Sequence, residues 1–152
     1  MRAQRTQRRD TIALLAMLIA LGGGWTGLPA EPLATAASRG SYTAAQAARG
    51  LTIYQARCAS CHGGALAGED TNPPLAGGRF LANWTGQSVG TLVTRIRTTM
   101  PLDEPNALGL LQTADVTAYL LQANGFRAGA GELPPDAAQL RQILIDPPDR
   151  VD

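Results

Sequence analysis

The spacing of apolar residues along the chain predicts helices, because they recur every three or four positions and no stretch alternates long enough for a strand. The first helix is expected to begin at 43–46, T-A-A-Q, which matches a capping box with Thr43 as the N-cap. It should run to about Arg57. Its buried stripe would comprise Ala47, Gly50, Leu51 and Tyr54.

Two further helices and a shorter fourth are expected downstream. Ser88 can cap a helix with the apolar stripe Val89, Leu92, Val93 and Ile96. Thr113 can cap the next helix, where Asp115 suits the positive first turn and Gly125 the C-terminal stop. The fourth helix is expected over 136–143, in a tail bounded by proline pairs. The chain is therefore predicted to be all-α, with three to four short helices joined by loops rich in glycine and proline.

The first 36 residues have the layout of a secretory signal. Arginine-rich residues come first, an apolar run over 12–21 follows, and A-T-A at 34–36 would place cleavage after Ala36. The run is short for a membrane span, which needs about 20 apolar residues. Extending it through the glycines gives a marginal span, so an uncleaved anchor is the alternative. Either way we expect export, with 37–42 as a short linker, 43–125 as the domain, and 126–152 as a tail whose short helix wraps the domain.

Composition points to a small domain with a thin core. Hydrophobic residues make up 45% of the chain, but many are alanine and aromatic residues are only 5%. Small domains with weak cores often recruit a disulfide, a metal or a cofactor. From residue 37 onward, nine arginines and ten acidic residues leave a net charge near −1. This balance argues against a nucleic-acid binder, which should carry a basic stripe.

Both cysteines and the single histidine of the chain lie within five residues, C-A-S-C-H at 58–62. A redox-active dithiol is usually found next to a βαβ unit, and no strand pattern is present here. A structural zinc site needs four ligands, and this chain offers only three strong ones. C-x-x-C-H is the specific signature of covalent haem attachment. Cys58 and Cys61 would then form thioethers to the porphyrin, and His62 would bind the iron. We favour haem, with zinc and dithiol chemistry as the alternatives.

Met100 is the candidate sixth ligand of that iron. No second histidine, no lysine and no other methionine remains once the signal is removed. Met100 lies in R-T-T-M-P at the end of the second amphipathic helix, where Pro101 forces the chain out of the helix. His/Met ligation raises the reduction potential of haem iron. The alternative is that Met100 fills a gap in the core and leaves the iron five-coordinate.

These motifs together resemble a class I mono-haem cytochrome c domain over about residues 41–125. The resemblance implies an all-α fold in which the N- and C-terminal helices cross at a glycine and at aromatic residues, matched here by Gly50, Tyr54 and Tyr119. N-P-P-L-A-G resembles the loop that follows the haem motif in this family. There, Pro73 would accept a hydrogen bond from Nδ1–H of His62, which fixes the tautomer of the ring.

Two residues of the next segment are further candidates for the haem pocket. By the same resemblance, Arg79 and Trp84 could hydrogen-bond the haem propionates. The alternative is that Arg79 is a surface arginine and Trp84 a core tryptophan.

The resemblance also implies a function. Segments such as P-P-L-A-G-G-R-F-L-A-N-W, I-R-T-T-M-P and E-L-P-P-D are similar to cytochromes associated with periplasmic quinoprotein dehydrogenases. They imply one covalent haem c and an electron carrier, not an enzyme, located in the periplasm or anchored to the inner membrane facing it. It would pass electrons from an exported dehydrogenase, such as a quinoprotein, to a terminal oxidase or another cytochrome of the respiratory chain. A membrane contact is expected only if the signal stays uncleaved.

Two other functions are left open. The chain could be the haem c subunit of an oxidoreductase complex, or a haem sensor or peroxidase-like protein in which Met100 is labile. For a carrier, we expect partners to dock near Cys61 and the Met100 loop, where Asp103 and Glu104 are candidates for partner contact. The low net charge predicts weak dependence of docking on ionic strength.

Overall fold

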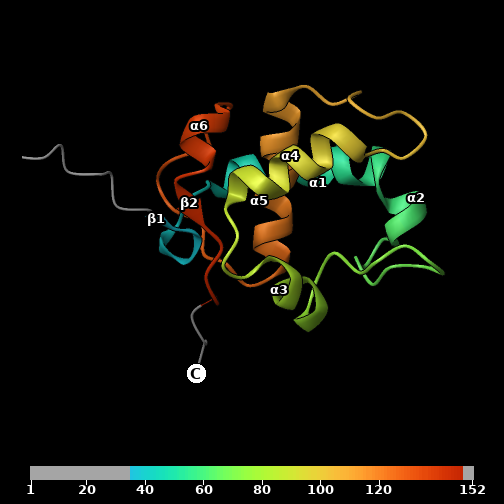
Figure 1. Cartoon of the computed structure of the whole chain (residues 1–152), viewed down its shortest axis with the longest axis horizontal. Coiled ribbons are helices and arrows are strands. Elements are labelled where there is room, and N and C mark those ends of the chain that lie inside the picture. Colours follow the sequence, from blue (N-terminus) through green and yellow to red (C-terminus); the bar gives the residue numbers. More distant parts are fainter. Residues whose placement is uncertain (1–34, 149–152) are drawn as a thin grey trace, which may run out of the picture. The chain divides into compact units, whose positions relative to one another are not determined.

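Helices are the dominant secondary structure of the protein, whose computed structural model describes residues 35–148 (Figure 1). The predicted secretory signal, apart from its last two residues, lies outside the described residues. In chain order the elements are β1 (Thr35–Ala36), the 3₁₀ helix η1 (Ala37–Arg39), α1 (Ala44–Arg57), α2 (Ala59–His62), α3 (Gly78–Trp84), α4 (Val89–Thr99), α5 (Leu110–Ala123), α6 (Ala137–Leu140) and β2 (Ile143–Leu144). Within 35–148, no helix combines the length and the apolar character that a membrane span requires.

The N-termini of α1 and α4 lie where the cap residues predict. The Thr43 hydroxyl accepts a hydrogen bond from the N–H of Gln46, and the Ser88 hydroxyl accepts one from the N–H of Thr91, both at 3.1 Å. The capping box of α1 is only half formed. The buried Gln46 amide instead exchanges two hydrogen bonds with the backbone of Leu133, at 3.0 and 2.8 Å. A tertiary contact has therefore replaced the local one that the sequence suggests.

The prediction that Thr113 caps α5 is wrong. The N-cap is Gly109, and α5 starts at Leu110, so Thr113 lies in the first turn, where its hydroxyl donates to the Gly109 carbonyl at 2.9 Å. Asp115 consequently lies inside the helix and not in its first turn. The C-terminal end is where we expect it, because Gly125 follows the helix with a φ of 84° that favours glycine.

Three short elements differ from the sequence prediction. α2 and α3 are not among the four predicted helices, and α6 ends at Leu140, before the predicted end at Ile143. Ile143 belongs to β2 instead, which pairs in parallel with β1 so that Ile143 lies opposite Thr35. Strands of two residues are too short to show alternation in the sequence. Cleavage after Ala36 would remove β1.

The helices α1 and α5 cross in close backbone contact at Gly50. A Cβ atom on Gly50 would lie 1.9 Å from the carbonyl oxygen of Asp115, so only glycine fits there without movement. Beside it, the rings of Tyr54 and Tyr119 pack with their centroids 5.3 Å apart. This confirms that the glycine and the aromatic residues mark the crossing. Leu51, expected in the buried stripe, is instead exposed.

The tail packs back onto the domain through apolar side chains. Leu133, Leu140 and Ile145 are at most 1% exposed and belong to the main core. The stripe predicted for α4 contributes to the same core with Val89, Leu92 and Val93, with Ile96 partly buried against it. The tail therefore supplies apolar mass to a domain that is otherwise poor in large side chains.

The segment 37–42, expected to be a linker, is also packed against the tail. Ala37 and Tyr42 are at most 1% exposed. The Tyr42 hydroxyl donates to the Phe126 carbonyl, and the Tyr42 carbonyl accepts from the N–H of Gly129 at 2.7 Å. Burial raises the pKa of the Tyr42 hydroxyl. These residues thus join the start of the domain to its end.

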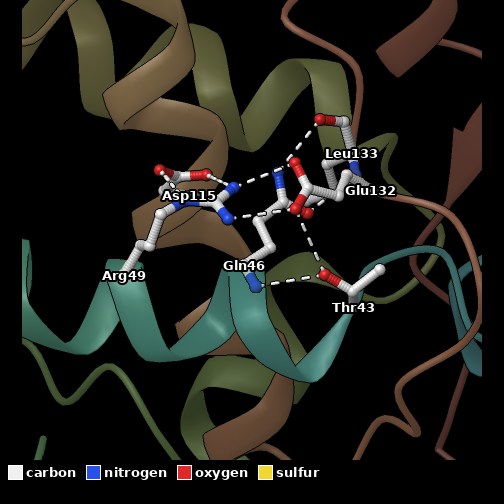
Figure 2. A network of polar contacts seen from close by, with 6 residues as sticks. All are labelled: Thr43, Gln46, Arg49, Asp115, Glu132 and Leu133. Carbon is white, nitrogen blue, oxygen red and sulfur yellow. Dashed lines mark hydrogen bonds and ion pairs between the residues drawn. The ribbon is translucent and has the colours of Figure 1, made fainter.

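A polar network ties the tail to the helix crossing (Figure 2). The Arg49 guanidinium lies between two carboxylates, with hydrogen bonds of 2.9–3.0 Å to Asp115 on α5 and to Glu132 in the tail. The Asp115 side chain is 5% exposed, whereas those of Arg49 and Glu132 are about half exposed. The hydrogen bonds that Arg49 donates to Asp115 and Glu132 raise the pKa of Arg49, and the bond to Glu132 lowers the pKa of that carboxyl.

The first prediction concerns the helix crossing. Gly50→Ala should lower the free energy of unfolding of the haem-bearing protein by about 2 kcal/mol, because overpacking costs about 1–3 kcal/mol. This loss should appear although alanine favours a helix more than glycine does. Gly64→Ala is the control, since a Cβ there meets no atom within 4 Å. Equal denaturant midpoints for the two variants would contradict the close crossing.

The second prediction concerns the pH dependence of the tail contact. The folded-state pKa of Glu132 lies below its unfolded value of about 4.3. The bond to Arg49 therefore stabilises the fold above that pH, and its contribution is lost as the pH falls through the lower, folded-state value. Glu132→Gln should lower the melting temperature near neutral pH. This gap between the melting temperatures of the variant and the unaltered protein should close in acid. Glu69→Gln, which removes an exposed loop carboxylate, should show no such gap. A gap for Glu132→Gln that persists in acid would contradict this prediction.

Candidate functional site

The C-A-S-C-H segment forms a single helical turn at the end of α1. Cys58 is both the C-cap of α1 and the N-cap of α2. Its carbonyl accepts hydrogen bonds from the N–H groups of Cys61 and His62, at 3.1 and 3.0 Å. Both thiols are free; Cys58 is half-buried and Cys61 is exposed. Burial raises the pKa of the Cys58 thiol.

The imidazole of His62 is held in one tautomer. Its Nδ1 lies 2.9 Å from the carbonyl oxygen of Pro73. A carbonyl oxygen can only accept, so Nδ1 carries a proton and the lone pair of the neutral ring lies on Nε2. His62 is 8% exposed. The ring is therefore buried, oriented and ready to bind a metal through Nε2, the arrangement usual for metal-binding histidines.

The loop after His62 brings Pro73 back to the ring. The His62 carbonyl accepts from the N–H of Gly68 at 3.0 Å. Gly68 has a φ of 78°, and a Cβ there would lie 2.5 Å from the carbonyl oxygen of Asn72. The turn at Gly68 therefore needs glycine on two grounds, its conformation and its close contact.

Tyr54 braces the same turn from α1. Its hydroxyl donates to the carbonyl of Gly63 at 2.6 Å, directly after His62. Burial, as the largest cause, raises the pKa of Tyr54 to about 12, so the hydroxyl stays protonated and can keep donating. The sequence marks Tyr54 only as an aromatic residue of the crossing and gives no sign of this bond.

The donor set fits a covalently attached haem better than the alternatives. Two free thiols and one imidazole share one turn, as thioether attachment and axial ligation require. The thiols are not paired in a disulfide. Among the residues that the structure describes, no group of three or more His, Cys, Asp or Glu side chains is placed to hold a metal ion. A zinc site therefore finds no support within residues 35–148.

A family model described as cytochrome c oxidase, cbb3-type, subunit III, matches residues 45–120, half of the chain. The chain belongs to this cytochrome c family. The class I mono-haem fold is thereby confirmed, and so is a covalently bound haem c, for which Cys58 and Cys61 have the attachment spacing. As a cytochrome c, the protein transfers electrons and is not itself an enzyme.

A solved structure extends the likeness beyond the family match. The sulfane dehydrogenase SoxCD from Paracoccus pantotrophus is 26% identical to this cytochrome, with a TM-score of 0.50. The similarity covers 82% of this chain and 68% of the matched chain. No curated protein sequence matches the cytochrome significantly.

The remaining candidate residues have different surroundings. Met100 is half-buried at the C-cap of α4, with its N–H bonded to the carbonyl of Ile96 at 2.9 Å. Arg79 is exposed on α3. Trp84 is partly buried and packs on Phe80, with ring centroids 6.3 Å apart. A contact of Trp84 with a propionate therefore stays a prediction.

The two acidic residues expected to contact a partner also differ. Asp103 is exposed and forms no ion pair within the described residues, whereas Glu104 pairs with Arg57. Sequence reasoning missed Arg57 because the two residues are 47 positions apart, and nothing local links them.

Proposed function

We propose that this cytochrome is an exported electron carrier in which His62 and Met100 are the two axial ligands of the haem iron. The observation that carries the proposal is the hydrogen bond from His62 Nδ1 to Pro73, because it leaves Nε2 free to bind iron. Met100 is supported by elimination, since beyond the signal no other methionine and no second histidine is present. When bound, haem c supplies reversible one-electron oxidation and reduction.

The residues of the chain have distinct tasks in this proposal. Cys58 and Cys61 hold the cofactor by thioether bonds, and Pro73 keeps His62 in the binding tautomer. Met100 would be the second iron ligand and would deny that position to substrates and gases. Arg79 is the candidate partner of a propionate, since its exposed guanidinium forms no ion pair within residues 35–148.

Location and partners complete the proposal. The arginine-rich start and apolar run of the chain favour export to the periplasm, with an uncleaved inner-membrane anchor as the alternative. The electron donor would be an exported dehydrogenase, such as a quinoprotein. The acceptor would be a terminal oxidase or another cytochrome of the respiratory chain.

A second candidate function is favoured by the likeness to SoxCD, a sulfane dehydrogenase. The chain would then work as the electron-transfer subunit of an exported oxidoreductase complex. The two candidates differ in the size at which the native protein migrates, alone or with a large partner.

The test of the proposal is the substitution Met100→Ala. It should abolish the weak long-wavelength absorption of a ferric haem bound by methionine, lower the reduction potential, and let the reduced protein bind carbon monoxide. Leu102→Ala is the control, because this neighbouring side chain is 74% exposed. It should leave all three properties unchanged. Carbon monoxide binding by the unaltered protein at neutral pH would contradict the proposed ligation and favour a haem sensor or peroxidase-like protein.

A further inference from the structure

An ion pair joins the two segments that supply the proposed iron ligands. Arg57 is the last residue of α1 and directly precedes Cys58. Glu104 lies four residues after Met100. The guanidinium Nη2 of Arg57 and the carboxylate Oε2 of Glu104 are 2.5 Å apart, and the side chains are 39% and 63% exposed. Two segments that are distant in the sequence are thus connected at the surface.

The loop that carries Glu104 has few other attachments. Residues 102–107 are all exposed, and the chain returns to the interior at Leu108, which is 4% exposed. Three backbone hydrogen bonds brace the loop: Glu104 N–H to Pro101, Ala107 N–H to Glu104 and Asn106 N–H to Arg97. These bonds stay within the loop or lead to the last turns of α4. In the described part of the chain, no other side-chain hydrogen bond or ion pair holds 101–107 to a second element.

We propose that the Arg57–Glu104 pair is a latch that fixes the loop after Met100 against the end of α1 and thereby keeps Met100 on the iron. The inference rests on the proposed ligation by Met100. The N–H of Met100 bonds to the carbonyl of Ile96, which fixes the backbone of Met100 to α4 on its N-terminal side. A movement of Met100 away from the iron would therefore involve the loop that follows it. Arg57 is a firm anchor for that loop, because the next residue is a point of haem attachment.

The strength of the pair suits this role. Exposed ion pairs contribute little to overall stability, because water screens them and two long side chains must be ordered. A contribution of that size cannot hold the fold together. It can shift a local equilibrium between bound and released Met100 several-fold. Arg57 and Glu104 are therefore positioning residues, which act on the iron through Met100.

The neighbour of Glu104 provides a matched control. Asp103 lies in the same exposed loop but forms no ion pair among residues 35–148. Glu104→Gln and Asp103→Asn change the net charge of the loop by the same amount, and each replaces a carboxylate by an amide of similar size. A difference between the two variants therefore reports the ion pair and not the charge near the haem.

The experiment is a titration of the oxidised, haem-bearing protein with imidazole, at a pH where imidazole is neutral. Imidazole can bind iron only after Met100 leaves, so its apparent affinity scales with the fraction of protein in which Met100 is released. Glu104→Gln should raise that apparent affinity about two- to fivefold, as expected for an exposed ion pair. Asp103→Asn should match the unaltered protein, and added salt should shrink the effect of Glu104→Gln.

Reversing the pair gives a rescue test. The double substitution Arg57→Glu with Glu104→Arg should restore the apparent affinity for imidazole towards that of the unaltered protein. A structural loss of packing at either position would not be restored by the exchange.

The outcomes separate the latch from the ligation on which it rests. Suppose that the absorption of methionine-bound ferric haem is present and that Glu104→Gln and Asp103→Asn have the same apparent affinity for imidazole. The latch is then wrong, while Met100 remains a ligand. If the unaltered protein lacks that absorption and binds imidazole as tightly as Met100→Ala does, Met100 is not an iron ligand. The proposed latch is then wrong as well. A selective effect of Glu104→Gln that reversal restores supports both.

Discussion

Three side chains that serve one cofactor share a single turn of helix, and the rest of the structure is arranged around the need to hold that turn. The backbone of Cys58 closes the turn through its bonds to Cys61 and His62. Tyr54 braces it from α1, and Pro73 fixes the ring of His62. A porphyrin attached at two points needs this rigidity, since both thiols and the imidazole must meet one planar group.

The crossing of α1 and α5 fixes the position of the turn that carries Cys58, Cys61 and His62. α1 carries the turn at its C-terminal end, and Gly50 lets the middle of α1 rest directly on the backbone of α5. The chain has few large side chains to fill a core, and two sources make up the deficit. One would be the covalently bound haem, and the other is the tail. The buried leucines and isoleucine of the tail pack on the domain, and Arg49 bonds both Glu132 of the tail and Asp115 on α5.

Most of the site could be predicted from the sequence because its signals are local. C-x-x-C-H is a contiguous motif, and the caps at Thr43 and Ser88 depend on bonds to residues three positions away. Thr113 misled the prediction because α5 begins with two leucines ahead of it, after a glycine cap that has no side chain to recognise. Leu51 is expected to be buried but is exposed, because helical spacing alone does not show how wide the buried stripe of α1 is.

The contacts that could not be predicted join residues far apart in the chain. The bonds of Arg49 to Asp115 and of Arg57 to Glu104 span 66 and 47 positions, and any arginine could have paired with any nearby carboxylate. The hydrogen bond of the Gln46 side chain to the backbone of Leu133 in the tail, and not to the N-terminus of its own helix, is another such long-range contact. Such choices are settled by tertiary packing, which propensity and spacing do not encode.

Covalent attachment of one haem to Cys58 and Cys61 can be checked by the intact mass of the protein purified from its own source. The measured mass should exceed that of the processed polypeptide by one haem, and the excess should survive denaturation and acid extraction of free haem. A mass equal to the polypeptide alone would contradict covalent attachment.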